Sequence, residues 1–204
     1  MIKKMILGTM ETNCYIVVND DTKECFIVDP ATNGQKIVKY LNENELTLKA
    51  ILLTHGHFDH IGAVDYLTDR CPCDVYTHEY TKDLLTDTGL NLSDMIFPFV
   101  VKSEVQNAPE SFELCGFKIQ WLLLEGHCQG SSMIYLPEEK VIFSGDVLFA
   151  GSIGRFDFPT SSNLKTKETL KTIKEYDFDA VIYPGHGESS SLSYEQQNNP
   201  YLNV

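Results

Sequence analysis

The sequence predicts an α/β (α+β) protein built from layers of helices and mixed β-sheets. Stretches with the apolar pattern of strands are interleaved with stretches whose apolar residues recur every three or four positions, as in helices. Several neighbouring strands are nonetheless separated only by tight turns. A purely parallel sheet would need a long crossover after every strand, so the short turns indicate antiparallel pairs and therefore mixed sheets.

The chain opens with a predicted β-hairpin. Residues 13–18 are rich in β-branched and aromatic side chains, a turn follows at 19–21, and residues 25–28 form the returning strand. After Gly34 the apolar residues of 37–46 fall three to five positions apart, which predicts a helix.

A buried strand and a second helix come next. The continuous apolar stretch 50–53 predicts a strand that runs into Thr54 and His55, and a helix is expected from Ile61 to about Thr68. The following segment mixes a strand at 75–77 with a short helix and a long connection to about residue 106.

Strand patterns return in the second half of the chain, at 112–124, 132–136, 141–144 and 180–183. A helix is expected over about 162–176. No repeat, low-complexity segment or linker interrupts the sequence, so a single domain spanning residues 1–204 is expected.

The composition excludes several kinds of partner. The chain carries 29 acidic and 16 basic side chains, a net charge of −13. Such a surface repels nucleic acid and anionic lipid, because both are bound through clustered Lys and Arg. No signal peptide and no stretch of roughly 20 apolar residues is found. We therefore predict a cytoplasmic protein acting on small molecules, with its six cysteines as reduced thiols.

Metal-binding side chains are concentrated in Thr54-His55-Gly56-His57-Phe58-Asp59-His60, directly after the predicted buried strand. Imidazole and carboxylate groups bind Zn, Fe and Mn. Side chains two apart on an extended segment point the same way, so His55 and His57 can hold one ion. Asp59 and His60 follow where the chain turns toward a helix and can face a second ion. Crowded buried histidines are hard to satisfy without a metal.

Three more polar residues stand just beyond other apolar strands and beside glycine, namely His127, Asp146 and His186. Glycine lets the backbone turn sharply and approach an ion closely. The remaining histidine, His78, precedes a helical stretch that Thr77 could cap, so we expect a structural role for it.

This order of motifs, THxHxDH, a GH loop, SGD and then PGHG, resembles the metallo-β-lactamase superfamily along essentially the whole chain. The resemblance implies a four-layer αββα sandwich of two mixed β-sheets flanked by helices, with the site at one edge. It also implies two divalent metal ions, with zinc as the default and iron or manganese as alternatives. Site one would use His55, His57 and His127, site two would use Asp59, His60 and His186, and Asp146 would bridge both.

Within the superfamily, Asp146–Arg155 and the closing Asn199-Pro200-Tyr201-Leu202 are similar to short, single-domain bacterial members of the glyoxalase II group. That resemblance implies a hydrolase that uses a metal-bridging hydroxide on a thioester such as S-lactoylglutathione. Asp59 would act in catalysis by taking a proton or holding the nucleophile in line. A thiolate leaves readily, so the reaction would need little general-acid help.

Two features depart from the larger glyoxalase II enzymes. The sequence stops where their C-terminal, glutathione-binding helical domain would begin, so that domain is expected to be absent. Their basic-aromatic-aromatic run is here Arg155-Phe156-Asp157. Arg155 and Phe156 are candidates for binding the substrate, and a structural pairing of Arg155 with Asp157 is an equally good interpretation.

Other activities of the same fold stay open. The run Gly154–Phe158 also matches persulfide dioxygenases, which use a single iron, although Gly151–Gly154 follows the hydrolase pattern more closely. A lactonase, a β-lactamase or another ester hydrolase would share the metal centre. A non-catalytic metal-binding module should have lost at least one ligand, and none is substituted here. The sequence does not determine the oligomeric state.

Overall fold

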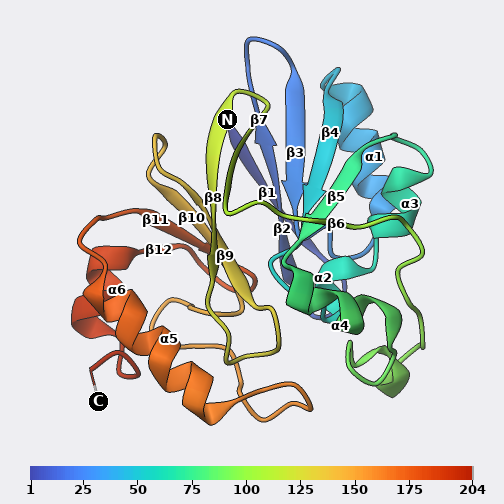
Figure 1. Cartoon of the computed structure of the whole chain (residues 1–204). Coiled ribbons are helices and arrows are strands. Elements are labelled where there is room, and N and C mark those ends of the chain that lie inside the picture. Colours follow the sequence, from blue (N-terminus) through green and yellow to red (C-terminus); the bar gives the residue numbers. More distant parts are fainter. Residues whose placement is uncertain (204) are drawn as a thin grey trace.

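The computed structural model describes residues 1–203 and consists of two six-stranded β-sheets packed face to face, with helices on both outer faces (Figure 1). The strand order is β1-β2-β3-β4-β5-β6 in one sheet and β12-β11-β10-β9-β8-β7 in the other. Each sheet contains both parallel and antiparallel pairs. The predicted four-layer sandwich of mixed sheets is confirmed.

The first sheet is made of β1 Ile2–Leu7, β2 Thr12–Val18, β3 Glu24–Val28, β4 Thr47–Leu52, β5 Asp74–Thr77 and β6 Gln106–Asn107. The first three strands are antiparallel neighbours, whereas β3 to β6 run parallel. The parallel connections pass through α1 Gly34–Glu43, α2 Phe58–Ile61, α3 Val64–Thr68 and α4 Lys82–Thr86. The carboxyl ends of β3, β4 and β5 therefore meet at one edge of the sheet.

The second sheet is made of β7 Ser111–Leu114, β8 Phe117–Leu123, β9 Ser132–Leu136, β10 Val141–Gly145, β11 Val181–Pro184 and β12 Ser190–Ser191. Only β10 and β11 are parallel among its pairs in residues 1–203, and α5 Asn163–Glu175 connects them. Helix α6 Leu192–Asn198 follows β12, and two 3₁₀ helices, η1 Glu79–Thr81 and η2 Ser93–Met95, lie in the first half.

The core has three apolar layers, one between the sheets and one beneath the helices on each side. Strand β2 shows how the layers form, because its side chains point alternately to opposite faces. Cys14 and Ile16 pack under the helices, while Tyr15 and Val17 pack between the sheets, and all four are buried. This packing holds the edge that carries the predicted metal ligands on buried strands of both sheets.

Two sequence predictions are wrong in detail. The helix predicted from Ile61 to Thr68 is split into α2 and α3 at Gly62, where the backbone passes close to Ala31: a Cβ on Gly62 would lie 2.9 Å from the Ala31 carbonyl oxygen. The strand predicted over 112–124 is a hairpin of β7 and β8, because Cys115 and Gly116 both turn with positive φ, 52° and 81°.

The other predicted elements lie within a few residues of their observed bounds, whereas β1, β6, β12 and α6 were not predicted. No disulfide links the six cysteines. In the described part of the chain, no helix is both long and apolar enough to cross a membrane.

Candidate metal centre

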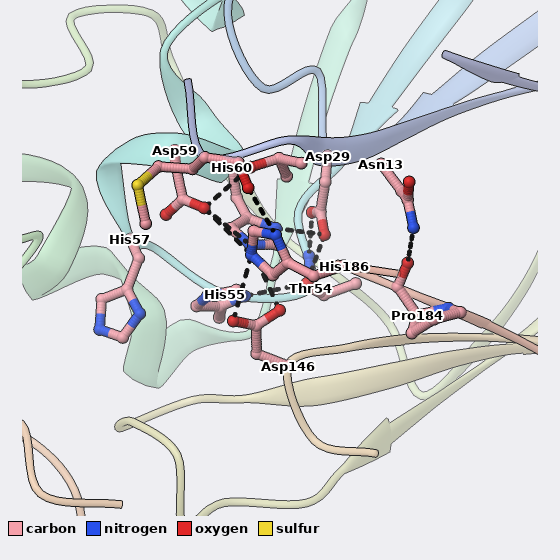
Figure 2. Close-up of polar contacts among 12 residues, drawn as sticks. Asn13, Asp29, Thr54, His55, His57, Asp59, His60, Asp146, Pro184 and His186 are labelled. Atoms are coloured by element: carbon pink, nitrogen blue, oxygen red, sulfur yellow. Dashed lines mark hydrogen bonds and ion pairs between the residues drawn. The ribbon is translucent and has the colours of Figure 1, made fainter. Parts of the chain in front are cut away.

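The seven predicted ligands converge at the edge where strand ends of both sheets meet. Figure 2 shows six of them at close range, with Asp146 reaching up from the second sheet toward the histidines and Asp59 of the first. The loop after β4 carries His55 and His57, and α2 carries Asp59 and His60. The remaining three, His127, Asp146 and His186, follow β8, β10 and β11.

Three histidines form the first group. Ligand atoms of His55, His57 and His127 lie within 4.8 Å of one another. Nε2 of His127 lies 2.9 Å from Nδ1 of His57. Because Nδ1 of His127 donates to a backbone carbonyl, its Nε2 presents a bare lone pair to His57. Nδ1 of His57 can donate its proton to this lone pair, or both nitrogens can bind one cation when neither carries the proton.

Asp59, His60 and His186 form the second group, again with ligand atoms within 4.8 Å. Oδ2 of Asp59 lies 3.2 Å from Nε2 of His186 and 3.5 Å from Nε2 of His60. Two ligand atoms on one tetrahedral ion, each about 2.0–2.2 Å from it, lie about 3.4 Å apart. These separations fit ligands of a common ion.

Asp146 faces both groups. Its Oδ2 lies 3.6 Å from Nε2 of His127 in the first group and 3.6 Å from Nε2 of His186 in the second. Its Oδ1 lies 3.4 Å from Nε2 of His60. The carboxylate therefore spans the two groups, as a bridging ligand would.

The donor set fits bound cations. Among the described residues, the buried atoms His55 Nε2, His60 Nε2 and Asp146 Oδ1 have no hydrogen-bond partner. A buried polar atom without a partner costs about 1–3 kcal/mol, so several in one place call for a ligand. Metal ions would satisfy them together. His57 Nε2 is also unpartnered, although its Nδ1 is the nitrogen that faces His127.

Three of these histidines have their outward ring nitrogen held by the protein, which leaves the inward nitrogen free. Nδ1 of His60 donates to Oδ2 of Asp29 at 2.9 Å. Nδ1 of His127 donates to the Arg155 carbonyl at 2.7 Å, and Nδ1 of His186 donates to the Met10 carbonyl at 3.1 Å. Such partners select the tautomer that can bind a metal.

Asp29 is a residue of the candidate site that the sequence motifs did not single out. It is buried at the end of β3 and also accepts hydrogen bonds from the Thr54 amide at 2.8 Å and the Thr54 hydroxyl at 2.6 Å. That hydroxyl in turn accepts from Nδ1 of His55 at 3.1 Å. The sequence did offer one indication, because Asp29 directly follows the strand β3, which runs parallel to β4. A carboxylate at that strand end lies beside the histidine motif that follows β4.

Burial keeps the first group of histidines neutral. It lowers the pKa of His55 well below the ordinary value and that of His57 to about 3, and the neighbouring imidazoles act in the same direction. Burial also lowers the pKa of His127, against the opposing effect of Asp146. Neutral imidazole is the form that binds metals.

The second group is dominated by its carboxylates. Burial opposes ionisation of Asp59 and Asp146, but His60 and the other imidazoles hold the pKa of both below the ordinary value. Burial likewise opposes protonation of His60, but the nearby carboxylates raise its pKa well above the ordinary value. The negative charge of this group therefore attracts a cation.

Glycine permits the close approach that the sequence predicted. A Cβ on Gly185 would lie 2.3 Å from Oδ1 of Asp146 and 2.6 Å from the His60 ring. Any side chain at this position would displace ligands of the second group.

The two tentative substrate residues face different surroundings. Arg155 makes a bidentate pair with Asp157, at 2.9 and 3.0 Å, and stacks over the Phe158 ring. Phe156 packs against the apolar layer under α5. Phe158 lies closer to the candidate ligands, with its ring centroid 5.3 Å from that of His57.

His78 lies outside both groups. The prediction that Thr77 caps the helix is wrong, because the Thr77 hydroxyl donates to the Leu53 carbonyl. His78 is itself the N-cap of η1, and its Nδ1 accepts from the Tyr80 amide at 3.2 Å.

Known proteins are similar to almost the whole chain. The family model described as the metallo-beta-lactamase superfamily matches residues 7–186. The chain is 36% identical to the probable metallo-hydrolase YqgX of Bacillus subtilis, over 98% of this chain and 97% of that protein. It is 32% identical to the hydroxyacylglutathione hydrolase GloC of Haemophilus influenzae, over 95% of this chain and 93% of that protein.

Two solved structures are similar in both sequence and fold. The BLEG-1 B3 metallo-beta-lactamase is 34% identical with a TM-score of 0.91, covering 100% of each chain. TTHA1623, solved in a di-iron-bound form, is 32% identical with a TM-score of 0.86, covering 98% of this chain and 99% of that chain.

Proposed function

The chain belongs to the metallo-β-lactamase superfamily, and from this we propose that it is a metal-dependent hydrolase of thioesters such as S-lactoylglutathione. The observation that carries the proposal is the position of Asp146, whose carboxylate oxygens face both groups of potential ligands. A carboxylate in that position suits a pair of ions rather than one.

In this proposal His55, His57 and His127 would hold one ion, Asp59, His60 and His186 would hold the other, and Asp146 would contribute to both. Zinc is the first choice, because imidazole and carboxylate are its usual ligands at catalytic sites. Iron and manganese suit the same ligands, and the similar TTHA1623 structure is a di-iron form. When bound, such ions lower the pKa of water toward about 7 and polarise a carbonyl group.

In the proposed reaction Asp59 would accept a proton or orient the attacking water, and two observations support this role. Its Oδ2 accepts from the Thr12 hydroxyl at 2.9 Å, which fixes the carboxylate in one orientation. The low pKa of Asp59 keeps it ionised, so it can orient a water molecule by accepting its proton in a hydrogen bond. Asp59 is buried, so bulk water does not compete freely for that role.

Aromatic rings flank the ligands on the two sides. Phe149 lies edge-on to His186 at 6.1 Å, and Phe158 lies edge-on to His57 and His127 at 5.3 and 5.8 Å. Apolar rings beside buried polar groups reduce solvent access and strengthen the electrostatic interactions among them.

A thioester suits these surroundings, because a thiolate departs without first receiving a proton. The similarity to GloC supports an S-acylglutathione as one such substrate. Arg155 could meet a carboxylate of the thiol half only by giving up its pair with Asp157. We therefore expect Asp157→Asn to lower the KM for S-lactoylglutathione and to leave that for a neutral thioester unchanged.

The test is turnover by metal-reconstituted protein with S-lactoylglutathione, a neutral thioester, a lactone, nitrocefin and glutathione persulfide, together with metal analysis. Hydrolysis of the thioesters with two ions per chain is expected. Asp146→Ala should abolish turnover and leave fewer than two ions, whereas the control His78→Ala should retain both. Full turnover by Asp146→Ala would refute the bridging role, and inactivity toward both thioesters would refute the substrate class.

Hydrolysis of β-lactams is the second candidate, and one observation favours it. The similar BLEG-1 structure covers 100% of each chain and is named as a B3 metallo-beta-lactamase. Turnover of nitrocefin without turnover of thioesters would select this candidate. Oxygen uptake with glutathione persulfide and a single iron per chain would instead indicate a dioxygenase.

A further inference from the structure

A groove of about 640 Å³ runs along α5, apart from the metal-ligand groups. Its floor is apolar and comes from three parts of the chain: Ile153 and Phe156 from the loop after β10, Leu170 from α5, and Tyr201 and Leu202 from the C-terminal segment. The volume is in the range of small-molecule sites, about 300–1,000 Å³.

The groove does not open into the metal centre. Ile153 and Leu170 line the groove and also line a small void touched by His127 and Asp146. That void measures about 10 Å³, which is at or below the space that one water molecule needs. A ligand in the groove would therefore lie behind the metal ligands and not on them.

Three lysines of α5 line the same groove: Lys167, Lys171 and Lys174. Spacings of four and three residues place them on one face of the helix. The neighbouring Lys165 does not line it and is paired with Glu125 at 2.6 Å.

The charges of the groove lysines are poorly compensated. Lys167 makes no ion pair or hydrogen bond with the described residues. Within residues 1–203, Glu175 is the one acidic residue of the lining. Lys171 reaches it only at 3.9 Å, with both side chains more than half exposed, so that pair contributes little and leaves the lining with an excess of positive charge. Lys174 donates to the Gln196 carbonyl at 2.8 Å and to the Asn203 side chain, and both partners are neutral. A positive rim of this kind contrasts with the chain's net charge of −13.

We propose that this groove binds an acidic amphiphile, a single molecule with an apolar chain and a terminal phosphate or carboxylate. The apolar body would cover the floor, where removal of apolar surface from water supplies the affinity. The acidic group would meet Lys167 and Lys171, whose ammonium groups can accept it without breaking a strong pair. The proposal does not depend on which ester the metal centre hydrolyses.

The groove and the metal centre share one segment. The Arg155 carbonyl orients His127 at 2.7 Å, and the next residue, Phe156, forms part of the groove floor. A bound amphiphile would touch the segment that orients His127, so its binding should also change the affinity of the protein for metal.

Isothermal titration of the metal-replete protein with monomeric dodecyl phosphate tests the proposal. Saturable binding at one site per chain is expected. Lys167→Gln combined with Lys171→Gln should weaken it at least tenfold, and Asn163→Trp, which fills the groove from its exposed edge, should weaken it without removing a charge. The matched control is Lys36→Gln with Lys39→Gln on α1, which removes the same charge elsewhere and should change nothing. Circular dichroism checks that each variant is folded.

Four results would overturn the proposal. Undiminished binding by the Lys167 and Lys171 double variant would place the ligand elsewhere, for example on the metal ions. Equal affinity for dodecyltrimethylammonium would remove the role of the lysines, and equal affinity for inorganic phosphate would remove the role of the apolar floor. If the protein sediments with phosphatidate vesicles but does not bind monomeric dodecyl phosphate, the ligand of the groove is a membrane surface and not a free amphiphile.

Discussion

Replacing Asp29 by asparagine should weaken binding of the second metal ion, although Asp29 belongs to the layer behind the ligands. Oδ2 of Asp29 accepts from two donors, Nδ1 of His60 at 2.9 Å and the Thr54 hydroxyl at 2.6 Å. In Asp29 the Thr54 amide donates to Oδ1 at 2.8 Å. If the asparagine side chain keeps its carbonyl oxygen in the place of Oδ1, its NH₂ group takes the place of Oδ2 and faces those two donors, which it cannot accept from. His60 then gains a partner only as the opposite tautomer, with its proton on Nε2.

A proton on Nε2 occupies the lone pair that faces Asp59 and Asp146, so the ring can no longer act as a ligand from that side. Loss of a partner behind a metal ligand typically costs 10–100-fold in metal affinity, or about 1.4–2.7 kcal/mol. We expect a loss of this size for the second ion, with a smaller effect on the first, since Asp29 reaches His55 only through Thr54.

The assay is metal content per chain after equilibration against buffers of graded free zinc. Asp65→Asn is the matched control, because Asp65 also accepts several hydrogen bonds, from Lys102 and Ser103, but lies outside both ligand groups. It should cost stability and leave both ions at the affinity of the parent protein. Unchanged affinity for the second ion in Asp29→Asn, or an equal loss in Asp65→Asn, would refute the tautomer argument.

Three further predictions concern packing, metal removal and thiol reactivity. Gly185→Ala should lose at least one ion, because the added Cβ would lie 2.3 Å from Oδ1 of Asp146. The control Gly151→Ala has a φ of +69° and nothing within 4 Å of the added atom, so it should cost about 1 kcal/mol of stability and no metal. Metal analysis of the two variants distinguishes these outcomes. Saturation at about 100 times the dissociation constant stabilises a fold by about 2.7 kcal/mol per ion, so chelation should lower the Tm by about 5–11 °C per ion, and an unchanged Tm in calorimetry would argue against a metal in the folded state. Burial raises the pKa of the Cys115 thiol to about 11, so its reactive thiolate should be scarce at pH 8 and increase as pH rises toward 11. Alkylation by iodoacetamide at pH 8 should therefore be at least about 100-fold slower than in the unfolded chain, and equal rates in mass spectrometry would contradict the burial argument.

The candidate ligands could be named from the sequence because the chemistry lies in the side chains themselves. A cluster of histidines and aspartates just beyond apolar strands is typical of a metal site, and parallel strands bring their carboxyl ends to one edge. His55 follows β4 of the first sheet and Asp146 follows β10 of the second, and the ends of these two strands lie at the same edge of the molecule. The resemblance to the metallo-β-lactamase superfamily predicted that these two strand ends meet, because strand positions alone do not say how one sheet packs against the other.

The elements that were missed lack a strong local pattern. Strand β1 lies at the edge of its sheet and carries Lys3 and Lys4, so only part of its surface is buried. Strands β6 and β12 contain 2 residues each, too few for any alternation to register. The break between α2 and α3 lies at Gly62, where the backbone passes close to Ala31, a residue distant in sequence whose approach does not show in the helical periodicity.

The layer behind the ligands was harder to predict because much of it is backbone. The carbonyls of Met10 and Arg155 orient His186 and His127, and a carbonyl has no residue signature. The sequence can, however, contain side chains that fix the loop to which such a carbonyl belongs. The closing motif Asn199-Pro200-Tyr201-Leu202 contributes such a side chain for the loop that carries Arg155.

Asn199, the first residue of that closing motif, is buried beneath the loop that follows Asp146. Its side chain donates to the Ser152 carbonyl at 3.1 Å and to Glu195 at 2.8 Å, and Glu195 accepts from the Gly151 amide at 2.9 Å. Glu195 and Asn199 are both fully buried, so these bonds hold the loop away from competing water. The C-terminal segment thereby fixes the path of the chain between Asp146, which faces both ligand groups, and the carbonyl that orients His127. A motif distant from every ligand can in this way belong to the metal centre.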